Sequence, residues 1–213
     1  MEHAVDVFWS FRSPYSYLAT PDMLRLRDDY ILDVNFRPVL PIAVRSKESL
    51  FTADKRPVRY LLTDFPRRAE FLGMPCGLPS PDPIVQNMET FEVADEQPYI
   101  YRLTGLGIEA ARRGRGLELA YHVSRLIWGG TSGWDQGDLL ANAVAEAGLN
   151  LEELESALLE NDPLPEIRAN QDALDASGHW GVPTFVFNGE PFFGQDRVET
   201  LRWRLDQVGV PRR

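Results

Sequence analysis

Apolar positions gather in short runs at both ends of the chain and follow a helical spacing between those ends. Residues 4–9, AVDVFW, indicate a buried strand, and residues 31–39, ILDVNFRPV, indicate a second one. The segment between them, residues 14–30, begins with a proline and carries an apolar side, which predicts a helix. We expect Pro21 to kink or divide this helix, because proline has no backbone N–H to donate.

Strand patterns return near the C-terminal end of the chain. Residues 182–187, VPTFVF, and the PFF that follows are separated by Asn188 and Gly189, a strong signal for a tight hairpin turn. A last helix is predicted after this hairpin. Asp196 is its expected N-cap, and Glu199 three residues later completes a capping-box pattern.

The middle of the chain, residues 40–178, is dominated by helical spacing, with loops rich in glycine and proline between the helices. The two ends therefore predict one α/β sheet unit, and the middle predicts an all-helical insertion. The expected helices cover residues 57–72, 98–113, 117–128, 136–147, 151–160 and 163–177.

Composition narrows the class of protein and partner. The 213 residues suffice for one large domain or for one domain with an insertion, and the net charge of -10 disfavours nucleic acid and anionic membrane as partners. No apolar run is long enough to span a membrane, and the N-terminus lacks a basic signal-peptide region. Cys76 is the single cysteine, so an internal disulfide is excluded and a cytoplasmic location is expected. The histidines show no zinc-ligand spacing, so no metal site is predicted.

The stretch SFRSPYSYLA, residues 10–19, lies where the first strand ends and the first helix begins. A helix N-terminus has unpaired N–H groups and a partial positive charge, so it stabilises anions, including a thiolate. The hydroxyl of Ser13 can donate a further hydrogen bond to such an anion. The alternative is that Ser13 serves only as the N-cap of the helix, and the local sequence leaves both interpretations open.

Two segments near the C-terminus carry further candidates. In GVPTFVF, Pro183 opens a buried strand, which is one setting for a cis peptide bond, although a trans proline at a strand start is the alternative. A cis bond would leave the N–H and C=O of Val182 free to pair with a peptide-like ligand. In FFGQDR, Asp196 caps the helix, binds an ammonium group, or does both, and Arg197 pairs with a carboxylate or faces solvent.

Read together, SPYSYLA, WGG and GVPTFVFNGEPFFGQDR resemble the 2-hydroxychromene-2-carboxylate isomerase family, a relative of the kappa-class glutathione transferases. The resemblance covers nearly the whole chain. It implies an α/β fold: a thioredoxin-like domain of the DsbA type with a large all-helical insertion. The expected division assigns residues 1–45 and 179–213 to the thioredoxin-like domain and residues 46–178 to the insertion.

The resemblance also implies glutathione as cofactor. Thioredoxin-like redox enzymes carry Cys-x-x-Cys where this chain has Ser13, Pro14, Tyr15 and Ser16, so disulfide exchange by this chain alone is excluded. In this family the serine replaces the nucleophilic cysteine, and the thiol arrives with the ligand. Ser13 is therefore expected to donate a hydrogen bond to the glutathione sulfur and to be the catalytic residue.

The other glutathione-binding residues follow from the same resemblance. Val182, before the presumed cis Pro183, matches the residue whose backbone pairs with the cysteinyl unit. Gln195 and Asp196 match the loop that receives the γ-glutamyl end, where a carboxylate suits the α-amino group and N–H groups at the helix start suit the α-carboxylate. Arg197 stands beside them in the same motif.

The implied reaction interconverts a cyclic 2-hydroxychromene-2-carboxylate and a trans-hydroxybenzylidenepyruvate by reversible thiolate addition and elimination. For this small aromatic carboxylate, Arg12 is a candidate for the pyruvate carboxylate or a solvent-facing arginine, and Trp128 is a candidate pocket wall or a core residue. A kappa-like glutathione transferase and a glutathione-binding protein with another substrate are the alternative functions. Relatives in this family suggest a homodimer.

The chain departs from the family pattern at three places. Ser10 stands where many relatives have aspartate, and no asparagine follows the second strand until Asn87. Relatives often carry a lysine three residues before the tyrosine of the next helix. If Tyr60 is that tyrosine, Pro57 occupies the lysine position, and the candidates for the lost cation are Lys55, Arg56 and Arg59.

Overall fold

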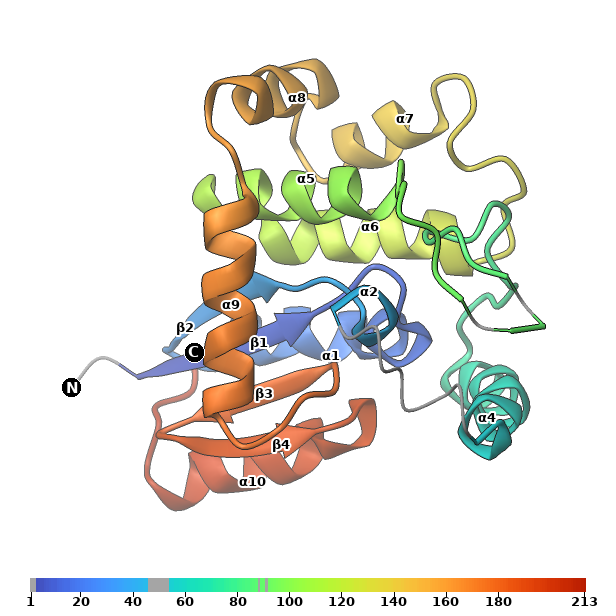
Figure 1. Ribbon diagram of the computed structural model, residues 1–213. Coiled ribbons are helices and arrows are strands. Elements are labelled where there is room, and N and C mark those ends of the chain that lie inside the picture. Colours follow the sequence, from blue (N-terminus) through green and yellow to red (C-terminus); the bar gives the residue numbers. More distant parts are fainter. Residues whose placement is uncertain (1–2, 46–53, 88, 91) are drawn as a thin grey trace.

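A four-stranded sheet in the order β2-β1-β3-β4 lies at the centre of the structure (Figure 1). The computed structural model describes residues 3–45, 54–87, 89–90 and 92–213, so the expected boundary at residue 46 lies outside the described residues. The inner pair of strands is β1 with β3, which are antiparallel; β1 is parallel to β2, and β3 is antiparallel to β4. The strands are β1 (Ala4–Trp9), β2 (Asp33–Pro38), β3 (Thr184–Phe187) and β4 (Glu190–Phe193).

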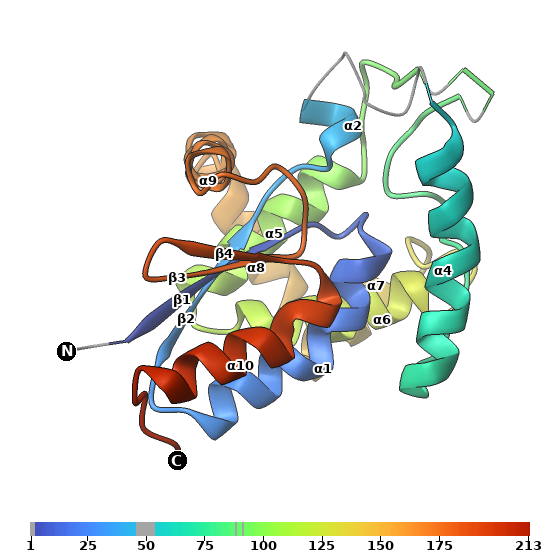
Figure 2. The ribbon, with the colours of Figure 1, turned by 90° about the horizontal axis from the view of Figure 1, so that it is seen from below.

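Helices cover both faces of the sheet (Figure 2). Helix α1, Pro14–Asp29, and helix α10, Val198–Gln207, lie on one face, whereas α9, Leu164–Ala176, lies on the other face against β2. The order of strands and helices is the one that the hydrophobic pattern predicts. The remaining elements are α2 (Ile42–Arg45), α4 (Arg56–Leu72), α5 (Ile100–Arg112), α6 (Gly116–Trp128), α7 (Leu139–Glu146), α8 (Leu151–Glu160) and the short 3-10 helix η1 (Gln195–Arg197).

Helix α1 continues through Pro21, so the expected division of this helix is wrong. Pro21 cannot donate to the carbonyl of Tyr17, four residues earlier. The hydroxyl of Thr20 donates to that carbonyl instead, at 2.7 Å. The freed carbonyl is thereby satisfied inside the core, and the helix carries on to Asp29.

The hairpin between β3 and β4 confirms the predicted turn. Asn188 and Gly189 have φ values of 51° and 78°. Positive φ at both central residues is what a type I′ turn requires, and asparagine followed by glycine meets that requirement with little strain. The turn sets the register in which Phe187 faces Glu190.

One cluster of buried apolar side chains joins the sheet to the helices of the predicted insertion. It contains Trp9 and Phe185 from the sheet, Leu18 from α1, Ile127 from α6 and Val144 from α7. Helix α6 packs on α1, and α5 packs on β2. The helices between β2 and β3 therefore rest on the sheet part through shared core, while the exact domain boundaries stay a prediction. Among the described residues, no helix combines the length and the apolar character that a membrane span requires.

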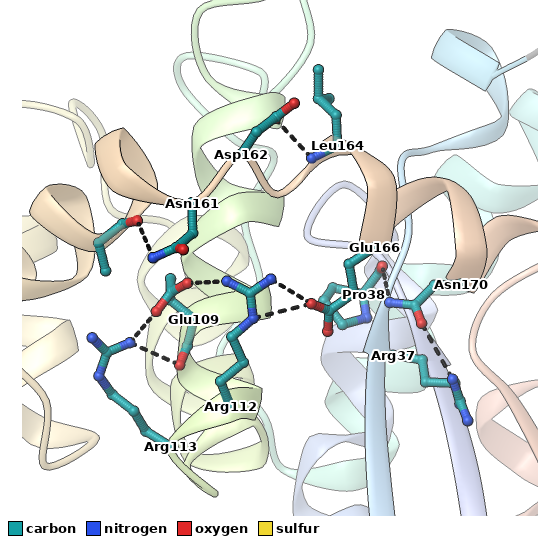
Figure 3. Close-up of polar contacts among 11 residues, drawn as sticks. Arg37, Pro38, Glu109, Arg112, Arg113, Asn161, Asp162, Leu164, Glu166 and Asn170 are labelled. Carbon is teal, nitrogen blue, oxygen red and sulfur yellow. Dashed lines mark hydrogen bonds and ion pairs between the residues drawn. The ribbon is translucent and has the colours of Figure 1, made fainter.

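Polar contacts fasten α9 to the sheet and to α5 (Figure 3). The side-chain amide of Asn170 donates to the carbonyl of Pro38 at 3.2 Å, and its oxygen accepts from Nη1 of Arg37 at 3.4 Å. Nearer the start of α9, Glu166 accepts from Nη2 of Arg112 at 2.6 Å. One of these hydrogen bonds ends on a backbone carbonyl and the other two join side chains, and together they hold α9 over the end of β2.

Asn170→Ala is expected to lower the free energy of unfolding by about 1–3 kcal/mol, because the buried carbonyl of Pro38 loses its donor. Urea denaturation followed by circular dichroism measures the change. Asp172→Ala, at an exposed position of the same helix, is the matched control and is expected to change stability by less than about 0.5 kcal/mol. Equal stability of the two variants would contradict a stabilising role for the hydrogen bond from Asn170 to Pro38.

Candidate functional site

The register of β1 and β3 brings the start of α1 to the start of β3. Phe8 lies opposite Thr184 in this antiparallel pair. Continuing the same register past the end of β1 places Ser10 opposite Val182. Ser13, in the turn that follows, donates from its Oγ to the carbonyl oxygen of Val182 at 3.2 Å.

Ser13 is the N-cap of α1, and its Oγ accepts the backbone N–H of Ser16 at 3.1 Å. The interpretation of Ser13 as an N-cap is therefore correct, but the cap uses only the acceptor side of the hydroxyl. A hydroxyl has one proton to donate besides its lone pairs, and Ser13 directs that proton across to β3. Because the side chain is half-buried, an anion that displaces the Val182 carbonyl can receive the same proton while the cap is kept.

The Val182–Pro183 peptide bond is cis, as predicted. Within the described residues, the N–H of Val182 donates no hydrogen bond, and its carbonyl accepts only from Ser13. An unpaired N–H beside a carbonyl held by a single hydroxyl is the pattern to which an extended peptide adds. The expectation of two free groups is therefore met only by the N–H, because Ser13 holds the carbonyl, and peptide binding at Val182 stays a prediction.

A tight turn at residues 194–197 is attached to the cis-proline segment. The N–H of Gly194 donates to the carbonyl of Pro183 at 2.9 Å. Gly194 has a φ of 111°, and a Cβ there would lie 2.8 Å from Oδ1 of Asp196. The exposed Asp196 side chain can move away from such a Cβ, so it is the positive φ that favours glycine here. The hydrogen bond to Pro183 joins the turn to the start of β3.

Asp196 does not cap the last helix, which corrects that expectation. Helix α10 begins at Val198 with Arg197 in the N-cap position and without a side-chain cap bond. The 3-10 turn η1 intervenes, so Asp196 lies before the helix start. Its Oδ2 accepts from Nη1 of the neighbouring Arg197 at 2.9 Å, and both side chains are exposed. Binding of an ammonium group is the interpretation of Asp196 that stays open.

Helix α4 contacts both sides of this site, which sequence analysis missed. The hydroxyl of Tyr15 donates to Oδ2 of Asp64 at 2.7 Å, and Nε of Arg68 donates to Oε1 of Gln195 at 3.1 Å. Burial and the hydrogen bond to Asp64 raise the pKa of Tyr15, and that same bond lowers the pKa of Asp64. The partners are 49 and 127 positions apart in the chain, so no local pattern could have indicated them.

Trp128 is a core residue, and the interpretation as a pocket wall is corrected. Its side chain is buried, and its indole Nε1 donates to the carbonyl of Phe11 at 2.9 Å. The ring also meets Phe65 edge-on, with centroids 5.4 Å apart. Trp128 therefore supports the turn that leads into Ser13 from the side of the helical part.

Arg12 is held in a two-bond ion pair, so neither of its expected roles is observed. Its Nε and Nη2 donate to the two carboxylate oxygens of Asp82, each at 3.0 Å. Asp82 also accepts the N–H of Ile84 at 3.0 Å. A carboxylate of the chain itself thus occupies the forked edge of the guanidinium that a substrate carboxylate would need.

The candidates for the lost family cation are Lys55, Arg56 and Arg59, and the structure gives the first two partners outside the Ser13 and Gln195 region of the chain. Nζ of Lys55 donates to the carbonyl of Glu89 at 3.1 Å, and Arg56 pairs with Asp54 at 2.8 Å. Arg59 is exposed on α4. Helix α4 instead brings Arg68 to the 194–197 turn. No group of three or more histidine, cysteine, aspartate or glutamate residues forms a potential metal site in the part of the chain that the structure describes.

Three stacked rings flank the Val182 segment. The ring of His179 lies 3.9 Å from that of Phe193 and 5.5 Å from that of Trp180, both nearly parallel to it. Nδ1 of His179 accepts the N–H of Gly181 at 2.9 Å. Phe193 and Trp180 are 44% and 43% exposed, so an apolar ring surface faces solvent at Trp180, two residues before Val182.

A family model described as "DSBA-like thioredoxin domain" matches residues 4–206. The chain belongs to this family. The match spans the sheet and the helices between its strands, and it confirms the predicted fold class.

Individual relatives of this DsbA-like chain carry names of two kinds. The chain is 23% identical over 211 residues to a 2-hydroxychromene-2-carboxylate isomerase from Pseudomonas putida. The aligned part covers 96% of this chain and 95% of that protein. A solved 2-hydroxychromene-2-carboxylate isomerase superposes with a TM-score of 0.72 at 22% identity, covering 96% and 95%. The cytosolic disulfide reductase DsbM from Pseudomonas aeruginosa, solved with GSH, gives 0.60 at 16% identity, covering 95% and 99%. The two structures share the fold of this DsbA-like chain.

His179 is expected to titrate below its ordinary pKa of 6.5, because burial disfavours the charged ring. Since the folded state then binds this proton more weakly than the unfolded state, the stability that neutral His179 contributes is lost as pH falls below about 6.5. NMR titration of the histidine ring protons gives the pKa. Phe193→Ala uncovers the ring and is expected to raise the pKa toward 6.5. An unchanged pKa in this variant would show that the stack does not bury His179.

Proposed function

We propose that the chain is a glutathione-dependent isomerase of 2-hydroxychromene-2-carboxylate-type aromatic substrates. One observation carries the proposal: the hydroxyl of Ser13, at the N-terminus of α1, lies within hydrogen-bond distance of the open peptide group of Val182. The similarity to the Pseudomonas putida isomerase supports the reaction. The GSH-bound structure of a protein with the same fold supports the cofactor.

The residues present fit a short peptide that carries a thiol. Val182 offers an unpaired N–H and a carbonyl, which are the two groups that a peptide backbone pairs with. Ser13 offers a hydroxyl proton at a helix N-terminus, where negative charge is stabilised. Asp196 offers an exposed carboxylate that suits an ammonium group. Glutathione has a thiol, peptide bonds and an ammonium group in one molecule.

Bound glutathione would supply the thiolate that adds reversibly to the conjugated carbon of the substrate and is regenerated. Ser13 would stabilise this thiolate by donating its hydroxyl proton, and the N-terminus of α1 would add its partial positive charge. Each unit by which the thiol pKa falls corresponds to about 1.4 kcal/mol of preference for the thiolate. As Ser13 turns away from Val182, the carbonyl of Val182 becomes available to a peptide N–H.

The ring stack beside Val182 supports an aromatic substrate. Trp180 and Phe193 present partly exposed rings, which attract a flat apolar group by stacking. His179 accepts from Gly181 at Nδ1, so the neutral ring carries its proton on Nε2. That N–H is a donor for a substrate oxygen. These residues replace Trp128 and Arg12 as our candidates on the substrate side.

Ser13→Ala is expected to lower the kcat of the glutathione-dependent reaction about 100-fold or more, since one donor to the developing charge is lost. The N-cap is lost as well, at a cost of about 0.5–2 kcal/mol of stability. Steady-state kinetics at saturating glutathione and thermal unfolding measure the two effects.

Asn150→Ala is the matched control for the cap. Asn150 is the N-cap of α8, where its side chain accepts the N–H of Glu153, and α8 does not contribute to the site. This variant is expected to lose a similar amount of stability and to keep full activity. Full activity in Ser13→Ala would reduce Ser13 to a cap and would remove the proposed mechanism.

A second test distinguishes the isomerase from a transferase. An isomerase regenerates glutathione, so the ultraviolet spectrum of a hydroxychromene carboxylate is expected to change while the concentration of free thiol stays constant. Both quantities are followed in one vessel with limiting glutathione. Loss of one thiol for each product molecule would establish a transferase in its place. Glutathione binding without reaction on this substrate would indicate a different substrate.

A further inference from the structure

Arg68 differs from most arginines of this chain in what it contacts. Its Nε donates to the side-chain oxygen of Gln195 at 3.1 Å, and its guanidinium lies 4.8 Å from the centroid of the Phe71 ring. Among the residues that the structure describes, no carboxylate forms an ion pair with it. The preceding residue, Arg67, points to Asp64 instead, with its Nη2 at 2.7 Å from Oδ1.

A glutamine amide orients a guanidinium without neutralising it. The bond to Gln195 uses Nε, and both terminal nitrogens of Arg68 stay without a hydrogen-bond acceptor among the described residues. Arginine presents its N–H donors in a planar fork, which matches a carboxylate better than any neutral acceptor. The chain has 32 acidic and 22 basic residues, so a half-buried arginine left without a carboxylate is unexpected and points to an anionic ligand.

Hydrogen bonds connect Arg68 to the thiol side of the site. Ser13 donates to the carbonyl of Val182, Gly194 donates to the carbonyl of Pro183, and Arg68 donates to Gln195, the residue after Gly194. A series of hydrogen bonds between residues that are neighbours in the chain therefore links the hydroxyl of Ser13 to the guanidinium of Arg68.

Positive and negative groups meet at the far end of this series of hydrogen bonds. Gln195, which accepts from Arg68, is followed directly by Asp196, whose carboxylate is exposed and forms a single ion pair with the equally exposed Arg197. A guanidinium and a carboxylate at one place are complementary to a group that carries both a carboxylate and an ammonium. Glutathione has such a group at its γ-glutamyl end, whereas its glycyl end has a carboxylate alone.

We propose that Arg68 binds the α-carboxylate of the γ-glutamyl unit of glutathione, with Gln195 holding the guanidinium in position. The proposal rests on the proposed function, because it names the recognition of that same cofactor. It makes α4 part of the binding site and gives this helix a ligand-dependent contact with the 194–197 turn.

The test compares two ligands in each of several variants by isothermal titration calorimetry. The ligands are glutathione and γ-aminobutyryl-cysteinylglycine, which lacks only the α-carboxylate. Wild type is expected to bind glutathione about tenfold or more tightly than the analogue. In Arg68→Gln, glutathione binding is expected to weaken to the level of the analogue, so that the ratio of the two dissociation constants approaches one. Arg68→Lys, which keeps the charge and loses the fork, is expected to give an intermediate ratio.

Arg59→Gln is the matched control. Arg59 is exposed on the same helix, and this substitution removes one positive charge, as Arg68→Gln does. It is expected to keep the wild-type ratio. A wild-type ratio in Arg68→Gln, with the fold intact by circular dichroism, would overturn the assignment of Arg68 and leave the proposed function standing. If the ratio of the two dissociation constants falls to one only in Arg197→Gln, Arg197 and not Arg68 binds the α-carboxylate of glutathione. Absence of binding of either ligand to wild type would overturn the proposed function and the role of Arg68 together.

Discussion

The pairing of β1 between β2 and β3 is the constraint on which the candidate site depends. Because β1 runs parallel to β2 and antiparallel to β3, its C-terminal end meets the N-terminal end of β3. The first helix starts at that point, and the cis-proline segment arrives from the other side. The sheet register therefore brings together a hydroxyl and a peptide group that are 169 positions apart in the chain.

The parts around this junction are held by buried donors that reach backbone carbonyls. Trp128 donates to Phe11 on the approach to Ser13, and the hydroxyl of Tyr17 donates to the carbonyl of Pro75 at 2.7 Å. Burial raises the pKa of Tyr17 to about 12, so this phenol stays neutral and keeps its proton across the physiological range. Both bonds connect the helical part to α1 or its preceding turn, and this connection holds the Ser13 hydroxyl in place relative to β3.

Charge is distributed unevenly around the site although the chain as a whole is acidic. Arg12 and Arg67 are matched by carboxylates of the chain, whereas Arg68 contacts a neutral amide. The positive end of α1 also faces the junction. A thiolate at Ser13 would therefore lie next to the positive end of α1, and a carboxylate at Arg68 would meet a guanidinium that no carboxylate of the described residues neutralises.

The sequence by itself determined the strands, most helix bounds and the Asn188-Gly189 turn, because each depends on neighbours within a few residues. It left the cap at Ser13 as one of two interpretations. Its motifs also indicated Val182 and Gln195. The prediction that Asp196 caps the last helix was wrong because the 3-10 turn moves the N-cap one residue on, from Asp196 to Arg197. Only the tertiary structure decided the partners of Arg12, Trp128, Tyr15 and Arg68, which lie 70, 117, 49 and 127 positions away. Local propensity carries no information about such distant pairs, since they form when the helices between β2 and β3 pack back onto the sheet.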